Sequence, residues 1–137
     1  MKFHAPDTLD AISVLLEQIE DALTAAEVPF AAIHAATLCI EELVVNILKH
    51  GRIEGKKPNI EIALHLEHGR IVIEITDDTN PFDPTTAAVP EHIDTPLEER
   101  PIGGLGIHLV KTLTDEMRYR RVGEHNHLRL VKRLEPT

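Results

Sequence analysis

A glycine run, Gly103-Gly104-Leu105-Gly106, stands directly before a helical pattern in the last third of the chain. Glycines let a backbone approach a ligand closely, and the free N–H groups at a helix N-terminus attract anions such as phosphate. The run is not a Walker A loop, because no Gly-Lys-Ser/Thr follows it. It is not the GxGxxG dinucleotide fingerprint either, because the position three after Gly106 is Leu109 and no strand precedes the run. Loops before helices often need glycine, so the run alone is a weak indication of an anion site.

A carboxylate continues the inward side of an apolar strand. Asp77 shares its parity with the isoleucines at positions 71, 73 and 75, so it is aimed the same way as they are. Buried carboxylates are rare unless their hydrogen bonds are satisfied. Asp77 either occupies such a satisfied site or lies just past the strand end in solvent, and the sequence leaves both alternatives open. Asp78 has the opposite parity and is expected in solvent.

A polar stripe follows one helix, because Glu42, Asn46 and His50 are spaced four residues apart. The stripe points well away from the apolar positions Ile40 and Val44. Lys and Glu would serve a purely solvated face as well, and Asn has only middling helix propensity, because its amide competes for backbone hydrogen bonds. The stripe is therefore either a solvated face or one wall of a site.

The composition is that of an ordinary globular chain. The 137 residues include 23 acidic and 14 basic ones, which gives a net charge of −9, and 42% are hydrophobic. We expect one domain, residues 1–137, that binds neither nucleic acid nor membrane, because phosphate repels so acidic a field. The single Cys39 excludes an intramolecular disulfide, and the uncharged run 28–40 is shorter than the roughly 20 residues that span a bilayer. The N-terminus has no signal-peptide core, so we expect a cytoplasmic protein.

Two periodicities predict the elements that position these features. Helical spacing predicts helices at about 7–26, with Asp7 as N-cap, and at about 30–50, ending at Gly51. The period of two predicts four strands, at 60–66, 71–77, 117–122 and 127–134. Five of the nine prolines fall within 81–101, which indicates a lid or a disordered loop before the third helix. This order predicts an α+β two-layer sandwich, with the helices on one face of a mixed, mostly antiparallel sheet.

In this order the features resemble the ATP-binding module shared by gyrase B, Hsp90, histidine kinases and MutL, known as the GHKL, Bergerat or histidine-kinase-like ATPase fold. Within it, the chain is most similar to the stand-alone anti-sigma-factor serine/threonine kinases of bacteria. These carry an ExxxNxxxH helix, a DxGxxFDP turn and a GGLGxxLV helix start, which correspond here to 42–50, 77–84 and 103–110. The resemblance covers roughly residues 5–134 and implies an ATP lid at about 84–102.

The resemblance implies a role for each feature. Asp77 accepts a hydrogen bond from the adenine amino group, and Asn46 ligates Mg²⁺ through its side-chain oxygen. Glu42 orients or deprotonates the attacking hydroxyl. Backbone N–H groups around Gly104 and Gly106 hold the phosphates. The other implied ATP-binding residues are Lys49 and His50 near the phosphates, Arg100 at the γ-phosphate, Phe82 as a packing anchor beneath the lid, and Thr79, Gly103, Leu105 and Ile107.

The function implied by the resemblance is an ATP-dependent serine/threonine protein kinase that acts as an anti-sigma regulatory factor. Such a kinase uses ATP and Mg²⁺ to phosphorylate a Ser or Thr of an anti-sigma-factor antagonist, a STAS-type protein. Unphosphorylated antagonist competes with a sigma factor for the kinase, and a homodimer is implied by analogy. The alternative is a non-catalytic switch of the same fold, in which ATP orders the lid and changes a partner surface.

Thr79 departs from the family pattern, which has glycine at this position of the DxGxxFDP turn. Glycine there permits a positive φ and a close approach to the base, whereas a β-branched residue tolerates neither well. We therefore expect either a different backbone path through the turn or weaker adenine binding. The second outcome would favour the non-catalytic switch.

Overall fold

A computed structural model describes residues 1–86 and 104–134, with only the backbone described at Gly104 and Leu105. Most of the expected lid, with Arg100, and also Gly103 lie outside these ranges. The helices and strands are, in chain order, β1 Lys2–His4, α1 Ile12–Ala25, α2 Phe30–Asn46, β2 Ile60–Glu67, β3 Arg70–Asp77, α3 Gly104–Leu113, β4 Glu116–Val122 and β5 His125–Arg133. Shorter turns are the 3-10 turns Leu9–Ala11 and Pro84–Thr86 and the π-helical turn Ile47–Gly51.

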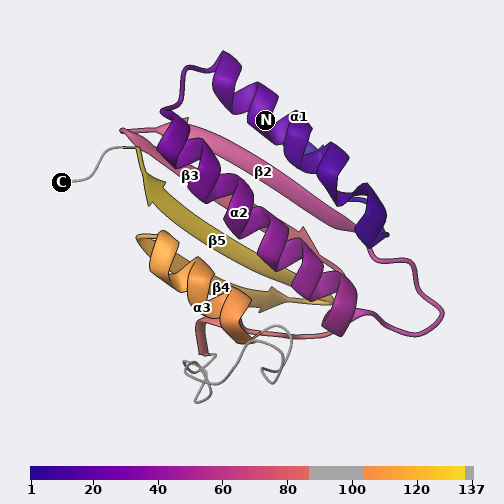
Figure 1. Cartoon of the computed structure of the whole chain (residues 1–137). Helices are drawn as coiled ribbons and strands as arrows, with labels where there is room; N and C mark the ends of the chain where they lie inside the picture. Colours follow the sequence, from indigo (N-terminus) through magenta and orange to yellow (C-terminus); the bar gives the residue numbers. More distant parts are fainter. Residues whose placement is uncertain (87–103, 135–137) are drawn as a thin grey trace, which may run out of the picture.

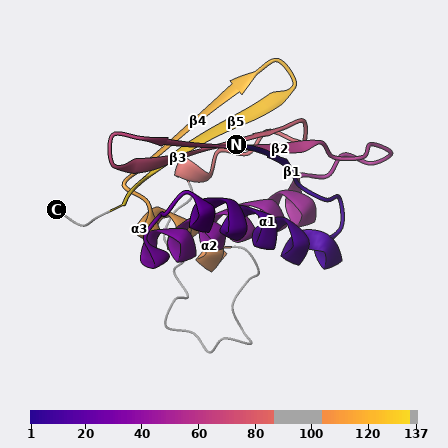
Figure 2. The same cartoon turned by 90° about the horizontal axis from the view of Figure 1, so that it is seen from above.

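One sheet carries the fold, in the strand order β1-β2-β3-β5-β4. The helices α1, α2 and α3 lie on the same face of this sheet (Figure 2), as expected for a two-layer α+β sandwich. Where the sequence suggested a mixed sheet, the described strands pair only in the antiparallel sense. Strand β1 was not predicted, because three residues are too few to show an alternation; its Phe3 pairs with Ile62 of β2.

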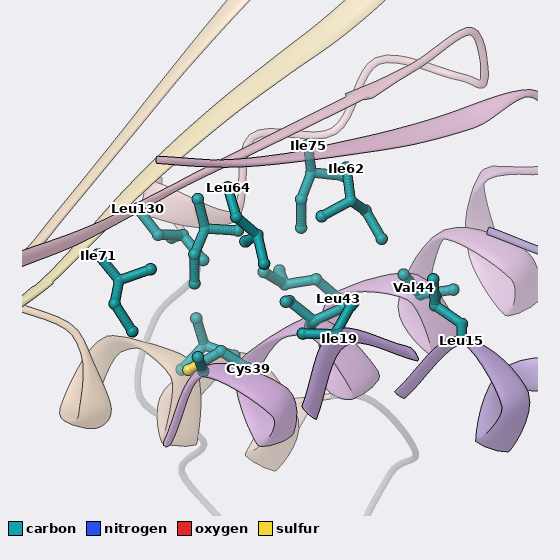
Figure 3. Close-up of a cluster of buried hydrophobic side chains, with 14 of the residues drawn as sticks. Leu15, Ile19, Cys39, Leu43, Val44, Ile62, Leu64, Ile71, Ile75 and Leu130 are labelled. Carbon is teal, nitrogen blue, oxygen red and sulfur yellow. The ribbon is translucent and has the colours of Figure 1, made fainter. Parts of the chain in front are cut away.

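Helix α2 runs between α1 and α3 across the sheet (Figure 1). Four of the five positions of its predicted apolar stripe are buried, and the fifth is partly buried at the start of the π-helical turn; the stripe is Ala36, Ile40, Leu43, Val44 and Ile47. Figure 3 shows side chains of α1 and α2, such as Ile19 and Leu43, meeting those of the sheet, such as Ile62. Cys39 belongs to this cluster, and burial raises the pKa of its thiol to about 11. The cysteine therefore acts as a small apolar side chain, as its place in the helix predicted.

The segment Phe30–Gly51 is 22 residues long, and its most apolar 18-residue window has a mean hydropathy of 1.6, so length and composition alone would let it cross a membrane. Half of its most apolar window is buried inside the fold. Its stripe packs on the sheet and on α1, which assigns it as the core helix of this domain.

The start of the first helix differs from the prediction. Asp7 is not its N-cap: a 3-10 turn begins at Leu9, and α1 begins at Ile12 with no side-chain cap bond at either start. The Asp7 carboxylate instead lies 3.6 Å from Lys57 Nζ, and its carbonyl accepts a hydrogen bond from Arg52. Asp7 therefore ties the N-terminal segment to the loop after α2.

Two β-hairpins determine which side chains of the sheet face the helices. The β2–β3 hairpin turns at His68-Gly69, as predicted, with φ values of +49° and +73°. The β4–β5 hairpin turns at Gly123, where φ is +59°, and its register with β3 places Asn126 opposite Asp77. Met117, where the expected strand 117–122 begins, lies on β4 and packs against the core. Asp77 at the end of β3 and Asn126 near the start of β5 therefore lie together at one polar end of the sheet.

Candidate functional site

A cavity of about 120 Å³ lies where α2 passes into its π-helical turn. Its walls come from α2, from the end of β3 and the segment that follows it, and from β4 and β5. Five predicted site residues line it: Asn46, His50, Asp77, Thr79 and Phe82. The fold therefore joins the polar stripe of α2 to the turn after β3.

Asp77 is the last residue of β3 and is only 4% exposed, so the alternative of a solvated strand end is wrong. Its Oδ1 accepts three hydrogen bonds: from Thr79 N at 3.0 Å, from Thr79 Oγ1 at 2.5 Å and from Asn126 Nδ2 at 2.9 Å. Its Oδ2 accepts none within the described part of the chain. The described fold therefore satisfies one carboxylate oxygen of Asp77 and not the other.

The backbone at Thr79 does not adopt the positive φ that favours glycine. Among the described residues, only Glu27 and His68 have a positive φ without being glycine. The carbonyl of Thr79 accepts a hydrogen bond from Arg121 Nη1 at 2.8 Å, and its side chain is 3% exposed. Of the two outcomes expected for this departure, the structure shows a turn whose backbone suits a β-branched residue.

The π-helical turn Ile47–Gly51 was not predicted, because the helical spacing of apolar residues runs on through it. Such turns occur often at functional sites. Here the turn brings Gly51 against Thr79, and the Gly51 carbonyl accepts a hydrogen bond from Asn80 N at 2.9 Å. The end of the α2 segment is thus bonded to the turn that holds Asp77.

Two further residues of the cavity were missed by the sequence analysis, Tyr119 and Asn126. Asn126 is 5% exposed, and its Oδ1 accepts a hydrogen bond from the Tyr119 hydroxyl. A signal was present, because Asn126 has the inward parity of Leu128 and Leu130, as Asp77 has that of its isoleucines. Because the expected strand begins only at residue 127, Asn126 falls outside it, and its parity was not considered.

A second hollow adjoins the first along α2. It is lined by Glu42, Asn46, Lys49, His50 and Gly106, among others. Asn46 and His50 line both hollows, so the polar stripe is their common wall. The start of α3 passes close to this wall: a Cβ at Gly106 would overlap Glu42 Oε2 and lie 3.3 Å from Glu42 Cδ. The glycine run and the stripe therefore meet, and a side chain at position 106 would displace the Glu42 carboxylate.

The pKa of Glu42 is raised above its ordinary value, chiefly because partial burial penalises the charged carboxylate. The neighbouring Glu41 charge raises this pKa further, while Lys49 lowers it. Within the described residues, the side chains of Glu42 and Asn46 make no hydrogen bond to protein groups. Raised pKa values and unused polar groups in a hollow are typical of functional sites.

The remaining predicted residues differ in their placement. Lys49 and His50 are exposed on the rim, and Phe82 is 47% exposed at the cavity. Ile107 is 4% exposed in the core, so only its backbone could reach a ligand. Leu105 lies in the first turn of α3, where unpaired N–H groups are expected.

Comparison with known proteins gives one family. The sequence profile described as "Histidine kinase-like ATPase domain" matches residues 5–132. The match covers all three motifs and every strand except β1 and the end of β5.

Two kinases are similar in sequence. The serine/threonine-protein kinase BtrW of Bordetella bronchiseptica is 29% identical over 100 residues, which cover 73% of this chain and 70% of BtrW. The serine-protein kinase RsbW of Listeria innocua is 25% identical over 92 residues, which cover 65% of this chain and 59% of RsbW.

Solved structures share the fold. The RsbU and RsbW domains of Rv1364c from Mycobacterium tuberculosis match with a TM-score of 0.67 at 18% identity, over 97% of this chain and 32% of that one. The blue-light activated histidine kinase of Erythrobacter litoralis EL346 matches with a TM-score of 0.58 at 18% identity, over 90% of this chain and 42% of that one.

Proposed function

Because this chain belongs to the histidine kinase-like ATPase domain family, we propose that it is an ATP-dependent serine/threonine protein kinase that acts as an anti-sigma regulatory factor. Its substrate is a Ser or Thr hydroxyl of an anti-sigma-factor antagonist of the STAS type. Unphosphorylated antagonist competes with a sigma factor for the kinase. The names of the two similar kinases support the reaction class.

The observation that carries this proposal is the position of Glu42. Its carboxylate lies against Gly106, in the hollow that shares Asn46 and His50 with the Asp77 cavity. A module that only binds nucleotide has no use for a free carboxylate there. Phosphoryl transfer needs one to position the acceptor hydroxyl and take its proton.

The cavity suits the adenine base. Its walls include the apolar side chains of Leu43, Ile47, Ile75 and Leu128. At its polar end, Asp77 Oδ2 accepts a hydrogen bond from the exocyclic amino group of the base. The structure of the turn at Thr79 supports an intact pocket and so weakens the argument for the non-catalytic switch.

The phosphates lie along the second hollow. Backbone N–H groups of Gly104, Leu105 and Gly106 at the start of α3 bind them, and Lys49 and His50 are near enough on the rim to add charge or hydrogen bonds. Arg100, which lies outside the described residues, remains an expected γ-phosphate ligand.

Magnesium fits the donor set at this place. Within residues 1–86 and 104–134, no three His, Cys, Asp or Glu side chains gather, so the fold offers no metal cage there. Mg²⁺ commonly takes one or two protein ligands and fills its shell with phosphate oxygens and water. The Asn46 amide oxygen is unused by the fold and borders both hollows. When bound, the ion neutralises phosphate charge, and Asn46 is the residue that would hold it.

In the transfer step, Glu42 accepts the proton of the Ser or Thr hydroxyl. The hydroxyl oxygen forms a bond to the γ-phosphorus, and the bond from that phosphorus to the bridging oxygen breaks, releasing ADP. The N–H groups at the start of α3 and the Lys49 ammonium on the rim stabilise the charge on the transferring group. A homodimer and a cytoplasmic location complete the proposal.

The test is phosphotransfer from labelled ATP to a candidate antagonist. We expect Glu42→Ala to bind ATP as the wild type does and to lose about 10²–10⁴-fold in transfer rate. Glu20→Ala, which removes an exposed carboxylate on α1, serves as the control. An equally fast Glu42→Ala variant would contradict the role of Glu42. ATP binding by the wild type without transfer to any antagonist would favour the non-catalytic switch.

A further inference from the structure

Thr79 contributes two separate donors to one oxygen of Asp77. The backbone N–H and the hydroxyl both bond to Oδ1, two residues back along the chain. The backbone bond would survive almost any substitution, whereas the hydroxyl bond requires Thr or Ser. The side chain that replaces the family's glycine is therefore part of the Asp77 site.

Gly51 makes the space for this side chain. A Cβ at Gly51 would lie 2.6 Å from Thr79 Oγ1 and 3.2 Å from Thr79 Cβ, both too close for ordinary contacts. The φ of Gly51 is not positive, so its backbone does not require glycine. Thr79 requires it, and the two residues form a matched pair.

Asn126 supplies the third donor, and its amide has one possible orientation. Its Nδ2 donates to Asp77 Oδ1 and to the Asn80 carbonyl, both at 2.9 Å. Its Oδ1 accepts the Tyr119 hydroxyl. A flipped amide would place its oxygen against two acceptors, so the neighbours fix which way the amide points.

On the basis of the proposed function, we infer that Thr79, Asn126 and Tyr119 are positioning residues that set the base selectivity of the cavity by fixing the Asp77 carboxylate. The three donors saturate Oδ1, and Oδ2 is left towards the cavity as an acceptor. A base with an exocyclic amino group donates to that oxygen. A base with a carbonyl in the same place meets it with a second acceptor and is rejected.

The network also explains why a merely apolar pocket would select poorly. Discrimination between a donor and an acceptor on the ligand requires a carboxylate oxygen that is held in place, because a mobile carboxylate can turn away from a carbonyl on the base. Without the hydroxyl and the amide, the Asp77 carboxylate keeps only the Thr79 backbone bond among those described and turns more freely. Nucleotides of both kinds then bind with more similar affinities.

The experiment compares ATP with inosine triphosphate, whose base carries a carbonyl in place of the amino group and a proton on the adjacent ring nitrogen. Dissociation constants are measured by calorimetry for the wild type, Thr79→Val, Thr79→Ser, Asn126→Ala and Tyr119→Phe. We expect the preference of the wild type for ATP to fall by about tenfold in Thr79→Val and Asn126→Ala, as for the loss of one hydrogen bond to a charged group. Thr79→Ser retains the hydroxyl and should keep the preference for ATP. Tyr119→Phe should weaken it less, because it acts only through Asn126.

The ratio of the two dissociation constants separates a positioning role from a structural one. A purely structural role would lower the melting temperature and weaken the binding of both nucleotides equally. An unchanged ratio in both Thr79→Val and Asn126→Ala, with ATP binding intact, would overturn this inference and leave the proposed function standing. A wild-type protein that binds neither nucleotide would overturn both this inference and the proposed function. If Asn126→Ala fails to fold, Thr79→Val, which conserves volume, and Tyr119→Phe decide the question.

Discussion

The role proposed for Glu42 in phosphoryl transfer comes at the expense of stability. Burial and the adjacent Glu41 disfavour its ionised form in the folded protein, so its pKa there lies above the unfolded value. A group of this kind destabilises the fold increasingly as pH rises through the raised pKa. The same shift brings the carboxylate nearer to the working pH of a general base.

We therefore predict that Glu42→Gln is more stable than the wild type at pH 7. Glutamine conserves the shape and removes the charge that burial opposes. At a pH below both pKa values, Glu42 is protonated in the folded and unfolded states, and the difference should disappear. Thermal melts at several pH values check this. Parallel pH profiles for the two proteins would show that Glu42 carries no stability penalty.

Thr79 shows the limit of pattern reasoning at one position. A glycine-to-threonine departure indicates a steric problem when the turn is judged by its motif alone. The structure resolves it with two other residues, Gly51 and Arg121, which are distant in the sequence. No local rule connects position 51 or 121 with position 79, so the compensation could not be predicted from the sequence.

Among the elements, the contact between the π-helical turn and the segment after β3 is the one most open to a direct test. We predict that Gly51→Ala destabilises the protein by about 1–3 kcal/mol, the usual range for overpacking. In a Thr79→Gly background the same change should be neutral or stabilising, because alanine is favoured over glycine in a helix by roughly 0.5–1 kcal/mol. Urea unfolding of the four proteins measures the coupling. Additive effects would mean that residues 51 and 79 do not compete for space.

The elements that could be predicted are those with a long periodic pattern. Helix α2 shows the helical period of apolar residues, and strands β2 and β3 show the period of two, each over 8 or more residues. These periods predicted which side chains face the core. Strand β1, the 3-10 start before α1 and the π-helical turn could not be predicted. The first two span three residues each, and the π-helical turn depends on tertiary contacts at Gly51 and Asn80.

For the whole molecule, nucleotide binding should appear as added stability. Ligand at about 100 times its Kd adds roughly 2.7 kcal/mol, a shift in melting temperature on the order of 5 °C for a domain of this size. We predict such a shift for the wild type with Mg²⁺-ATP and its loss in Asp77→Asn, which conserves volume at the cavity. A wild type without any shift at millimolar ATP would contradict nucleotide binding itself.

The meeting of the three motifs was predictable only through the family resemblance. Their residues lie at 42–50, 77–84 and 103–110, and spacing alone does not say that they border two adjoining hollows. The antiparallel pairing of β3 with β5 brings Asn126 opposite Asp77 and completes the wall. Pairings between distant strands are set by the whole fold, and this is why Tyr119 and Asn126 were missed.

The strand order has a consequence for folding during synthesis on the ribosome. Strand β5 lies between β3 and β4, so the last of the described strands is an inner strand of the sheet. Helices α1 and α2 and the β2–β3 hairpin can form from nearby partners, but the pairing of β3 with β5 must wait until β5 has left the exit tunnel. Until then Asp77 has no Asn126 opposite it, and the cavity lacks one wall.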